Sequence, residues 1–128
     1  MISGLDITPA VPGGRKIVQA YGDGRFRISG ESVQGSVVVW PEGVAAWPVA
    51  ATDGITIESL DAVRMIVQPI DLLLIGCGKA FVPEPAGLRA ALRKSGLGLE
   101  WMDTGAACRT YNVLLGEDRR VAAALIAV

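Results

Sequence analysis

The stretch Asp71–Gly78, read Asp-Leu-Leu-Leu-Ile-Gly-Cys-Gly, decides the fold that this sequence predicts. Its four consecutive large aliphatic residues, Leu72–Ile75, show no alternation with polar residues. A strand with this pattern is buried on both faces, as in the middle of a sheet that helices cover. Gly76 and Gly78 then let the backbone turn sharply, because they lack a Cβ atom. Open α/β sheets place their binding sites at such a strand-to-loop edge, so we expect the functional edge of the domain here.

The residues around this strand predict alternating helices and strands. We expect helices over 60–68, 85–95 and 105–115, and strands over 97–102 and 121–128. Ser59 and Asp103 are candidate N-caps of the first and third helix, since their side-chain oxygens can accept a hydrogen bond from the first turn. The connection through the middle helix has the length of a right-handed crossover, so the two strands that it joins should be parallel neighbours.

The first half of the chain predicts short strands that tight turns connect. These strands are Ile17–Tyr21, Arg25–Ser29, Gly35–Trp40 and Val44–Trp47. Residues 1–14, rich in proline and glycine, are expected to form a loosely packed N-terminal arm. The prediction is therefore a single α/β domain over residues 1–128. It has three layers: a central mixed β-sheet, helices that cover it, and an N-terminal β-hairpin region.

Composition and charge exclude several classes of function. Twelve basic and 13 acidic residues give a formal net charge of −1, so neither nucleic acid nor an anionic membrane is an expected partner. No apolar run reaches the about 20 residues that a membrane-spanning helix needs. The first residues lack the features of a signal peptide, and we expect a cytoplasmic protein. An apolar fraction of 51% fits an association surface, which includes the case of a homo-oligomer.

The chain contains no histidine, which removes the commonest catalytic base and metal ligand. Its two cysteines, Cys77 and Cys108, form no CxxC motif. We therefore predict neither a metal site nor a cofactor, and no catalytic residue. Two reduced, mostly buried thiols are expected. The alternative is a redox pair, because both thiols would lie near the same edge of the sheet.

The Gly76-Cys77-Gly78 turn invites comparison with the loops that bind dinucleotides. The full fingerprint needs glycine or alanine at position 81, where this sequence has Phe81. Pro83 and Pro85 also delay the next helix, so its N-terminus cannot lie against a pyrophosphate. We do not expect a standard dinucleotide site.

Several residues near this edge are nevertheless candidates for binding a ligand. They are Gly76, Cys77, Gly78, Lys79, Arg109, Thr110, Tyr111 and Asn112. With Arg119, the cations Lys79 and Arg109 would surround an anion beside the start of the 105–115 helix. The simpler interpretation is that the cations are solvated surface charges. The Tyr111 hydroxyl would then be a buried group with a fixed partner.

Three aromatic residues are candidates for contacts with a protein partner. Trp40 and Trp47 flank a turn and are expected to face each other across a hairpin. They form either a satellite core under the sheet or an exposed aromatic anchor, since tryptophan is enriched in interface hot spots. Phe81 belongs to the loop edge after the buried strand and is the third candidate.

Four blocks of the second half resemble a family signature in their content and order. They are Asp71–Gly78, Met102–Thr104, Ala107–Leu114 and Glu117–Leu125. From about Ile17 to Leu125 the sequence resembles the uncharacterised-domain family that includes mitochondrial complex I assembly factor 3 and the adipogenesis-associated vertebrate protein of the same fold. Asp118 departs from the family pattern, in which glycine is common at this position. A turn that needs a positive φ is therefore less expected here, although aspartate tolerates a positive φ better than most residues.

The resemblance implies a three-layer α/β fold whose central mixed sheet has a last strand antiparallel to its neighbours. It carries over no catalytic residue, because none is established for the family. Its eukaryotic members act through protein association in respiratory-complex assembly. The first hypothesis is therefore a non-enzymatic, assembly-factor-like domain with a protein client. The alternative is a small-molecule or anion-binding protein, with enzymatic activity left open, whose pocket lies at the Gly76–Gly78 edge.

Overall fold

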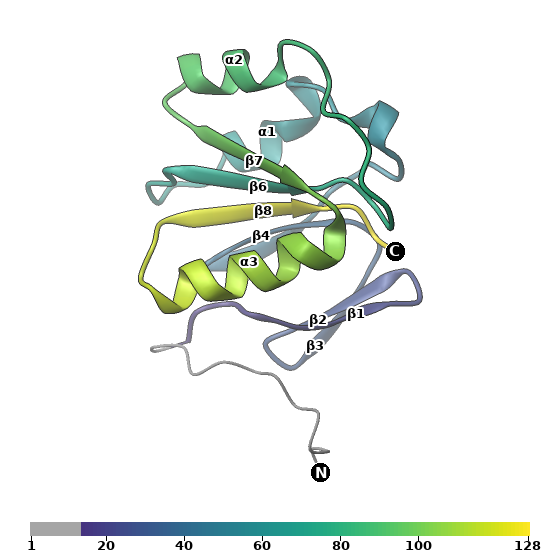
Figure 1. Cartoon of the computed structure of the whole chain (residues 1–128). Coiled ribbons are helices and arrows are strands. Elements are labelled where there is room, and N and C mark those ends of the chain that lie inside the picture. Colours follow the sequence, from purple (N-terminus) through teal and green to yellow (C-terminus); the bar gives the residue numbers. More distant parts are fainter. Residues whose placement is uncertain (1–13) are drawn as a thin grey trace.

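Two β-sheets organise residues 14–128, the part of the chain that this computed structural model describes (Figure 1). The first sheet is antiparallel, in the order β1-β2-β3, with strands Val18–Gly22, Arg25–Ile28 and Glu31–Gln34. The second is mixed, in the order β5-β4-β8-β6-β7, with strands Gly43–Ala46, Val37–Trp40, Val121–Leu125, Leu72–Gly76 and Gly98–Met102. The arm expected over residues 1–14 lies, except for Gly14, outside the described residues.

The predicted central strand is β6, which pairs in parallel with both β7 and β8. The parallel crossover from β6 to β7 is thereby confirmed. The expectation that the last strand is antiparallel to its neighbours is wrong for β6, although β8 is antiparallel to β4. The physical reason is the helix α3, Thr104–Gly116, which returns the chain from the end of β7 to the start of β8. β8 therefore runs in the same direction as β6 and β7.

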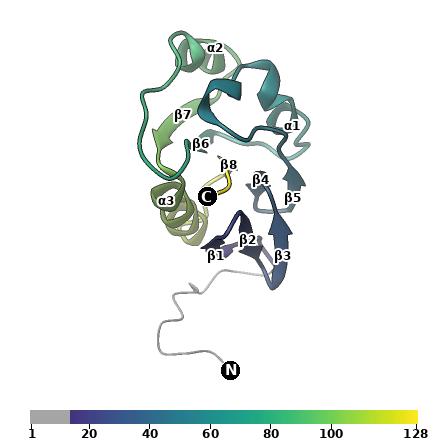
Figure 2. The same ribbon diagram turned by 90° about the vertical axis from the view of Figure 1, so that its right-hand side faces the viewer.

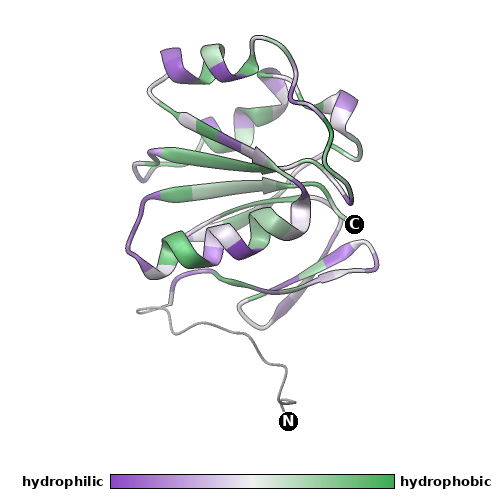
Figure 3. Ribbon diagram, viewed as in Figure 1, coloured by the Kyte–Doolittle hydropathy of each residue, from purple (hydrophilic) through white to green (hydrophobic). Residues whose placement is uncertain are grey.

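Helices cover both faces of the five-stranded sheet, which makes three layers (Figures 1 and 2). The helices α1, Asp61–Arg64, and α2, Leu88–Lys94, lie on one face. α3 and the three-stranded sheet lie on the other. Along β6, Leu73 and Ile75 belong to the core under α1 and α2, whereas Leu74 belongs to the core under α3. Figure 3 shows β6 and β8 as hydrophobic along their length, as strands with two buried faces require.

The helix expected over 60–68 is shorter than predicted, because α1 ends at Arg64. A 3₁₀ helix, Glu58–Leu60, precedes it. Ser59 does not cap α1. It lies within the 3₁₀ helix, where its hydroxyl donates to Thr56 O at 2.7 Å and accepts from Thr56 N at 2.9 Å. None of the helices in residues 14–128 has the length and hydropathy to cross a membrane.

The sequence pattern does not predict β3, because its residues are mostly polar and exposed. β3 forms through the turn at Ser29 and Gly30, both of which have a positive φ, 46° and 89°. Its partner β2 alternates as predicted: Phe26 and Ile28 are buried, whereas Arg25 and Arg27 are exposed. The buried side chains of β2 join the core under α3, so the small sheet is attached to the domain by apolar packing.

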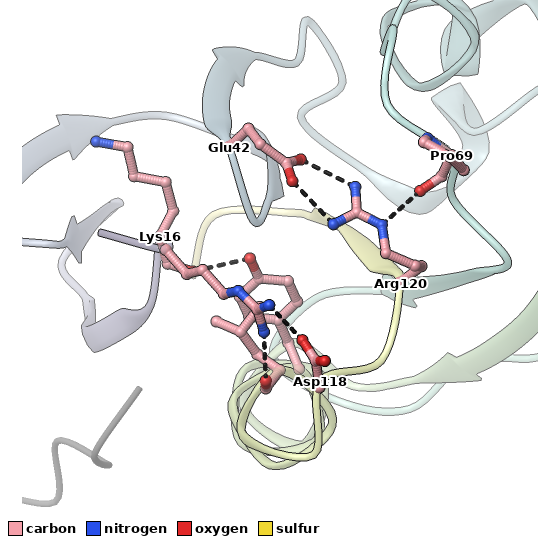
Figure 4. A network of polar contacts seen from close by, with 8 residues as sticks. Lys16, Glu42, Pro69, Asp118 and Arg120 are labelled. Atoms are coloured by element: carbon pink, nitrogen blue, oxygen red, sulfur yellow. Dashed lines mark hydrogen bonds and ion pairs between the residues drawn. The ribbon is translucent and has the colours of Figure 1, made fainter. Parts of the chain in front are cut away.

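A bidentate ion pair joins the β4–β5 turn to the start of β8 (Figure 4). Arg120 donates to both carboxylate oxygens of Glu42, at 2.8 and 3.0 Å, and its Nε donates to Pro69 O at 2.8 Å. The hydrogen bond from Arg120 lowers the pKa of Glu42. Three segments that are distant in sequence therefore meet at the amino end of β8.

The segment before β1 is attached to the C-terminal half of α3 (Figure 4). Arg15 pairs with Asp118 and donates to Leu115 O at 3.4 Å. The Tyr111 hydroxyl donates to Lys16 O at 2.8 Å. Asp118, where glycine is common in the family, has a φ of 62° and therefore a left-handed backbone. These contacts fix where the three-stranded sheet begins.

Candidate functional site

Hydrogen bonds within the chain close the carboxyl edge of the parallel strands. Gly78 N donates to Thr104 Oγ1 at 3.1 Å, and Thr104 N donates to Gly78 O at 2.9 Å. The Thr104 hydroxyl donates in turn to Ile126 O at 2.8 Å. Cys77 N donates to Met102 O at 2.8 Å. The amides of Cys77 and Gly78 are thus occupied, and they do not form the free cradle that an anion would need.

The two glycines of the turn serve different structural purposes. A Cβ atom on Gly76 would lie 2.8 Å from Thr104 Cα and 3.1 Å from Leu125 Cδ2. Gly76 therefore permits close packing between β6 and the first residue of α3. Gly78 has open space around it but a φ of 118°, which side chains rarely tolerate. Close packing therefore accounts for Gly76, and backbone conformation accounts for Gly78. Contact with a ligand is not required to explain either glycine.

A hollow of about 530 Å³ lies at this edge, beside the start of α3. Its lining residues are Tyr21, Gly22, Asp23, Lys79, Asp103, Gly105, Arg109 and Val128. The structure thus brings together Lys79 and Arg109, two of the residues predicted from the sequence. It adds Tyr21 and Asp23 from the β1–β2 hairpin, which the sequence pattern does not indicate. Tyr21 and Asp23 lie far from Lys79 in the sequence, so no local motif indicates that they belong to the same site.

The charges in the hollow are mixed rather than uniformly positive. Arg109 Nη1 donates to the Tyr21 hydroxyl at 3.2 Å, so the cation is held over the start of α3. Asp103 caps that helix, as predicted, and accepts from Ala106 N at 2.9 Å. Its negative charge is stabilised by the helix dipole. Lys79 and Arg109 are exposed, and they provide the positive side of the hollow.

The hypothesis of a redox pair is wrong, because the two thiols do not lie close together. Cys77 and Cys108 are both free and each is 3% exposed. Cys77 belongs to the core under α1 and α2, whereas Cys108 belongs to the core under α3, so the sheet separates them. Burial raises the pKa of Cys108 to about 12, which keeps this thiol protonated at neutral pH. The Cys77 thiol donates to Ala80 O at 3.6 Å.

Four other predicted polar residues do not line the hollow. The Tyr111 side chain, on the inner side of α3, is fully buried, and burial raises its pKa. Asn112 pairs with the backbone of Val18, accepting from its N at 3.0 Å and donating to its O at 2.7 Å. Thr110 lies half-buried on α3. Arg119 follows the opposite end of α3, so the predicted anion cluster of three cations is wrong in including it.

The two tryptophans are parts of a core and do not face each other. Trp47 is 2% exposed, and its Nε1 donates to Ser59 O at 2.7 Å. Trp40 is partly buried against the same core under α1 and α2. In the β4–β5 register Trp40 lies opposite Gly43, whereas Trp47 follows β5. The expectation of an exposed anchor is therefore wrong for Trp47, and the core interpretation is confirmed.

Phe81, by contrast, is 62% exposed on the loop between β6 and α2. Hydrogen bonds from side chains hold the part of this loop that follows Phe81. The Trp101 Nε1 donates to Val82 O at 2.6 Å. Further along, Arg89 donates to both carboxylate oxygens of Glu84, at 2.8 and 3.1 Å. Phe81 is therefore an apolar side chain that an ordered loop presents to solvent, close in sequence to Lys79 of the hollow.

Taken together, the fold and the edge define a mixed α/β domain with an attached antiparallel sheet and a hollow lined by residues of both charges, and not a nucleotide-binding fold of the standard type. The chain belongs to the family described as Protein of unknown function (DUF498/DUF598), whose model matches residues 18–126. The predicted resemblance is thereby confirmed.

Two similar proteins place the chain within this family. An uncharacterized protein of Rhodobacter capsulatus is 37% identical over 122 residues, which are 94% of this chain and 93% of that one. The Xenopus tropicalis protein named NADH dehydrogenase (ubiquinone) 1 alpha subcomplex assembly factor 3 is 33% identical over 109 residues, 85% of this chain. The chain spans 60% of the length of that assembly factor.

The fold is also that of a solved structure, a protein described as an outer membrane protein from Bartonella henselae. Its TM-score against this chain is 0.81 at 39% sequence identity, and the match covers 93% of this chain and 99% of that one. The three-layer fold with a central mixed sheet is thus shared with a solved relative.

Proposed function

We propose that this chain is a protein-binding domain that assists the assembly of a larger complex, and that it acts in the cytoplasm. The observation that carries this proposal is the similarity over 109 residues to a protein named as an assembly factor of NADH dehydrogenase. The proposed client is a subunit of an NADH dehydrogenase complex. The contact acts through surface complementarity and involves no covalent chemistry.

Phe81 is the residue that we propose as the anchor of the client contact. Its ring is 62% exposed, and burying a phenylalanine side chain contributes roughly 1.5–3 kcal/mol. The loop is already ordered by the hydrogen bond from Trp101 to Val82 O. Less conformational entropy is therefore lost when a partner covers the ring. Aromatic residues on ordered surfaces commonly form the hot spots of interfaces.

The test uses native cells that contain this chain and an NADH dehydrogenase complex. Removal of the chain should lower the amount of assembled complex, measured on native gels, and the wild-type chain should restore it. Phe81→Asp should fail to restore assembly, because it places a charge where the client buries a ring. Val113→Asp, which changes another apolar residue that is 59% exposed, should restore it. Normal assembly without the chain would contradict the proposal.

The hollow at the carboxyl edge favours a second candidate function, the binding of a small anionic or polar molecule. Its volume of about 530 Å³ is in the range of ligand pockets. Lys79 and Arg109 would supply the charge-assisted hydrogen bonds. Phosphate or a small dicarboxylate should then raise the melting temperature of the wild-type chain but not that of Lys79→Met or Arg109→Met. Equal shifts for all three chains would contradict a site at this hollow.

A further inference from the structure

The five-stranded sheet ends in two edge strands, β7 and β5, and β5 is the open one (Figure 2). β5 consists of small, uncharged residues, Gly43–Ala46. Trp47 N donates to Ser36 O at 2.9 Å, which fixes the hydrogen-bonded pairs between β4 and β5. Because such pairs alternate along an antiparallel ladder, the N–H and C=O groups of Val44 and Ala46 point away from β4. Within residues 14–128, these groups have no hydrogen-bond partner.

The other three strand edges carry features that prevent pairing with another chain. On β7, Arg89 Nη1 donates to Leu99 O at 2.6 Å, so a side chain from α2 occupies a backbone carbonyl of this edge. On β1, the Asn112 amide occupies both the N–H and the C=O of Val18. β3 is mostly polar and exposed. In the part of the chain that the structure describes, β5 is therefore the apolar edge that no side chain blocks.

A second copy of this chain fits the β5 edge in one antiparallel register. With a two-fold axis between the two Ala45 residues, Val44 of each copy lies opposite Ala46 of the other. Each copy then donates two hydrogen bonds and accepts two, which uses every outward-facing backbone group of β5. An axis at Ala46 would place Pro48, which has no N–H, opposite Val44. An axis at Val44 would place the turn residue Glu42 opposite Ala46.

The size and the charge of these residues allow two identical edges to approach each other. In the register about Ala45, the side chains that meet are alanine with alanine and Val44 with Ala46. Glu42, the charged residue nearest to β5 in the sequence, is neutralised by Arg120, which donates to its oxygens at 2.8 and 3.0 Å. Like charges that lie opposite each other destabilise paired strands. The β5 edge adds no such repulsion, so it is compatible with its own copy.

We propose that β5 pairs with β5 of a second copy, antiparallel about an axis between the two Ala45 residues. The two five-stranded sheets then form one continuous sheet, and open sheets of about ten strands occur in proteins. A strand of four residues buries less than the roughly 1,200 Å² of stable complexes, so the dimer forms only as the concentration rises. Phe81 follows β6, and β8 and β4 lie between β6 and β5. The proposed client contact is therefore separate from this edge.

Amide hydrogen exchange in the ¹⁵N-labelled full chain tests the pairing residue by residue. Exchange is measured by NMR at about 20 µM and at about 1 mM chain. Exchange at Val44 and Ala46 should slow about threefold or more at the higher concentration, because their N–H groups gain partners. Ala45 is the internal control, because its N–H already faces β4. Sedimentation equilibrium over the same range should show the mass rising from that of a monomer toward that of a dimer.

Two lysine variants with matched chemistry locate the interface. Ala46→Lys should weaken the dimer about tenfold or more, because it places a charge of the same sign on both edges. Ala80→Lys adds the same charge to an exposed alanine in the loop after β6 and should leave the dimer unchanged. Ala46 is exposed, so its replacement should leave the circular dichroism spectrum and the melting temperature nearly unchanged.

Two cysteine variants test the register independently of the lysine variants. Ala45→Cys should link two copies when the chain is oxidised with diamide, because opposite residues of a pair without hydrogen bonds have Cα atoms about 4.5 Å apart. Ala46→Cys should not, because the two Ala46 residues lie diagonally, about 7–8 Å apart. The native Cys77 and Cys108 are each 3% exposed and should not compete.

Several outcomes would overturn the proposal of a β5 dimer. These are a monomer at about 1 mM, unchanged exchange at Val44 and Ala46, equal effects of the two lysine variants, or faster linking through Ala46→Cys than through Ala45→Cys. A monomeric wild-type chain whose Ala46→Lys variant fails to restore complex assembly in cells would assign the edge to an extended client segment instead. The measurements on the purified chain contain no client, so their failure leaves the proposed function standing.

Discussion

Gly76 shows how closely the central strand approaches the first turn of α3. A methyl group there would lie 2.8 Å from the backbone of Thr104, and backbone atoms cannot move aside as a flexible side chain can. Gly76→Ala should therefore lower the free energy of unfolding by about 1–3 kcal/mol in urea denaturation.

A second glycine provides the control for this substitution. A Cβ atom on Gly116, the last residue of α3, would have no atom within 4 Å. Gly116→Ala should leave stability unchanged or raise it by up to about 1 kcal/mol, because alanine favours helix. Equal effects of the two substitutions would show that packing against Thr104 is not what requires glycine at Gly76.

Some individual residues were predictable because their requirement is local. Asp103 precedes a helix and carries a side chain that suits an N-cap, and it does cap α3. The departure of Asp118 from glycine made a positive φ at this turn less expected, yet its φ is 62°, a conformation that aspartate tolerates better than most residues. Cys77 and Cys108 were predictable as buried thiols. Their separation by the sheet was not, because it depends on which face of a strand each residue meets.

At the scale of elements, the Asn112 side chain forms the hydrogen bonds with the β1 backbone that a neighbouring strand would otherwise form. Its amide accepts from Val18 N and donates to Val18 O, at 3.0 and 2.7 Å. Asn112→Ala would leave both backbone groups without these partners, so the free energy of unfolding should fall by about 1–3 kcal/mol. Hydrogen exchange at the Val18 amide should also become faster. Thr110→Ala, two residues earlier on α3, is the control and should leave that amide unchanged.

The ion pair between Glu42 and Arg120 predicts an acid-sensitive contact between the β4–β5 turn and β8. The hydrogen bond from Arg120 lowers the pKa of Glu42 in the folded chain below its ordinary value of 4.5. The folded state therefore binds fewer protons than the unfolded state in this range. The resulting stability is present above pH 4.5 and is lost as the pH falls through the lowered pKa.

Glu42→Gln should remove this part of the pH dependence. The Glu42 side chain is 37% exposed, so solvent screening limits the effect to under about 1 kcal/mol. Urea denaturation of both chains between pH 3 and pH 7 is the measurement. The two stability curves should converge at the acid end, and curves that stay parallel would contradict the assigned role of the pair.

The elements that the sequence predicts well are those with a strong periodic pattern. β6 follows from four consecutive aliphatic residues, and α3 follows from its cap and its apolar face. α1 is shorter than its pattern predicts, because the chain leaves the helix at Met65 before Pro69 is reached. β3 has a polar sequence, and its pairing with β2 arises from the turn at Ser29 and Gly30. Tight turns of this kind outweigh the weak strand propensity of the residues that follow them.

At the scale of the whole molecule, we expect residues 14–128 to unfold as one unit, as the single-domain prediction requires. α3 contacts both sheets, and its Tyr111 donates to Lys16 O just before β1. Native-state hydrogen exchange should therefore give similar free energies of opening for Phe26 in β2 and Leu74 in β6. A much lower value for Phe26 would show that the small sheet detaches first and would contradict a single cooperative domain.

The candidate site was only partly predictable, because it is assembled from distant parts of the chain. Lys79 and Arg109 lie where the β-α-β pattern places them, at the carboxyl edge of the parallel strands. Tyr21 and Asp23 reach the hollow only because the β1–β2 hairpin lies beside the start of α3.

The position of β8 has a consequence for how the protein is made. β8 lies between β4 and β6, yet it follows every other strand in the sequence. A ribosome therefore synthesises the strand in the middle of the sheet after all of its neighbours. Until then β4 and β6 each lack one partner and expose an unpaired edge. A domain that we propose as a helper of assembly thus passes through a stage in which its own half-built sheet is open to wrong partners.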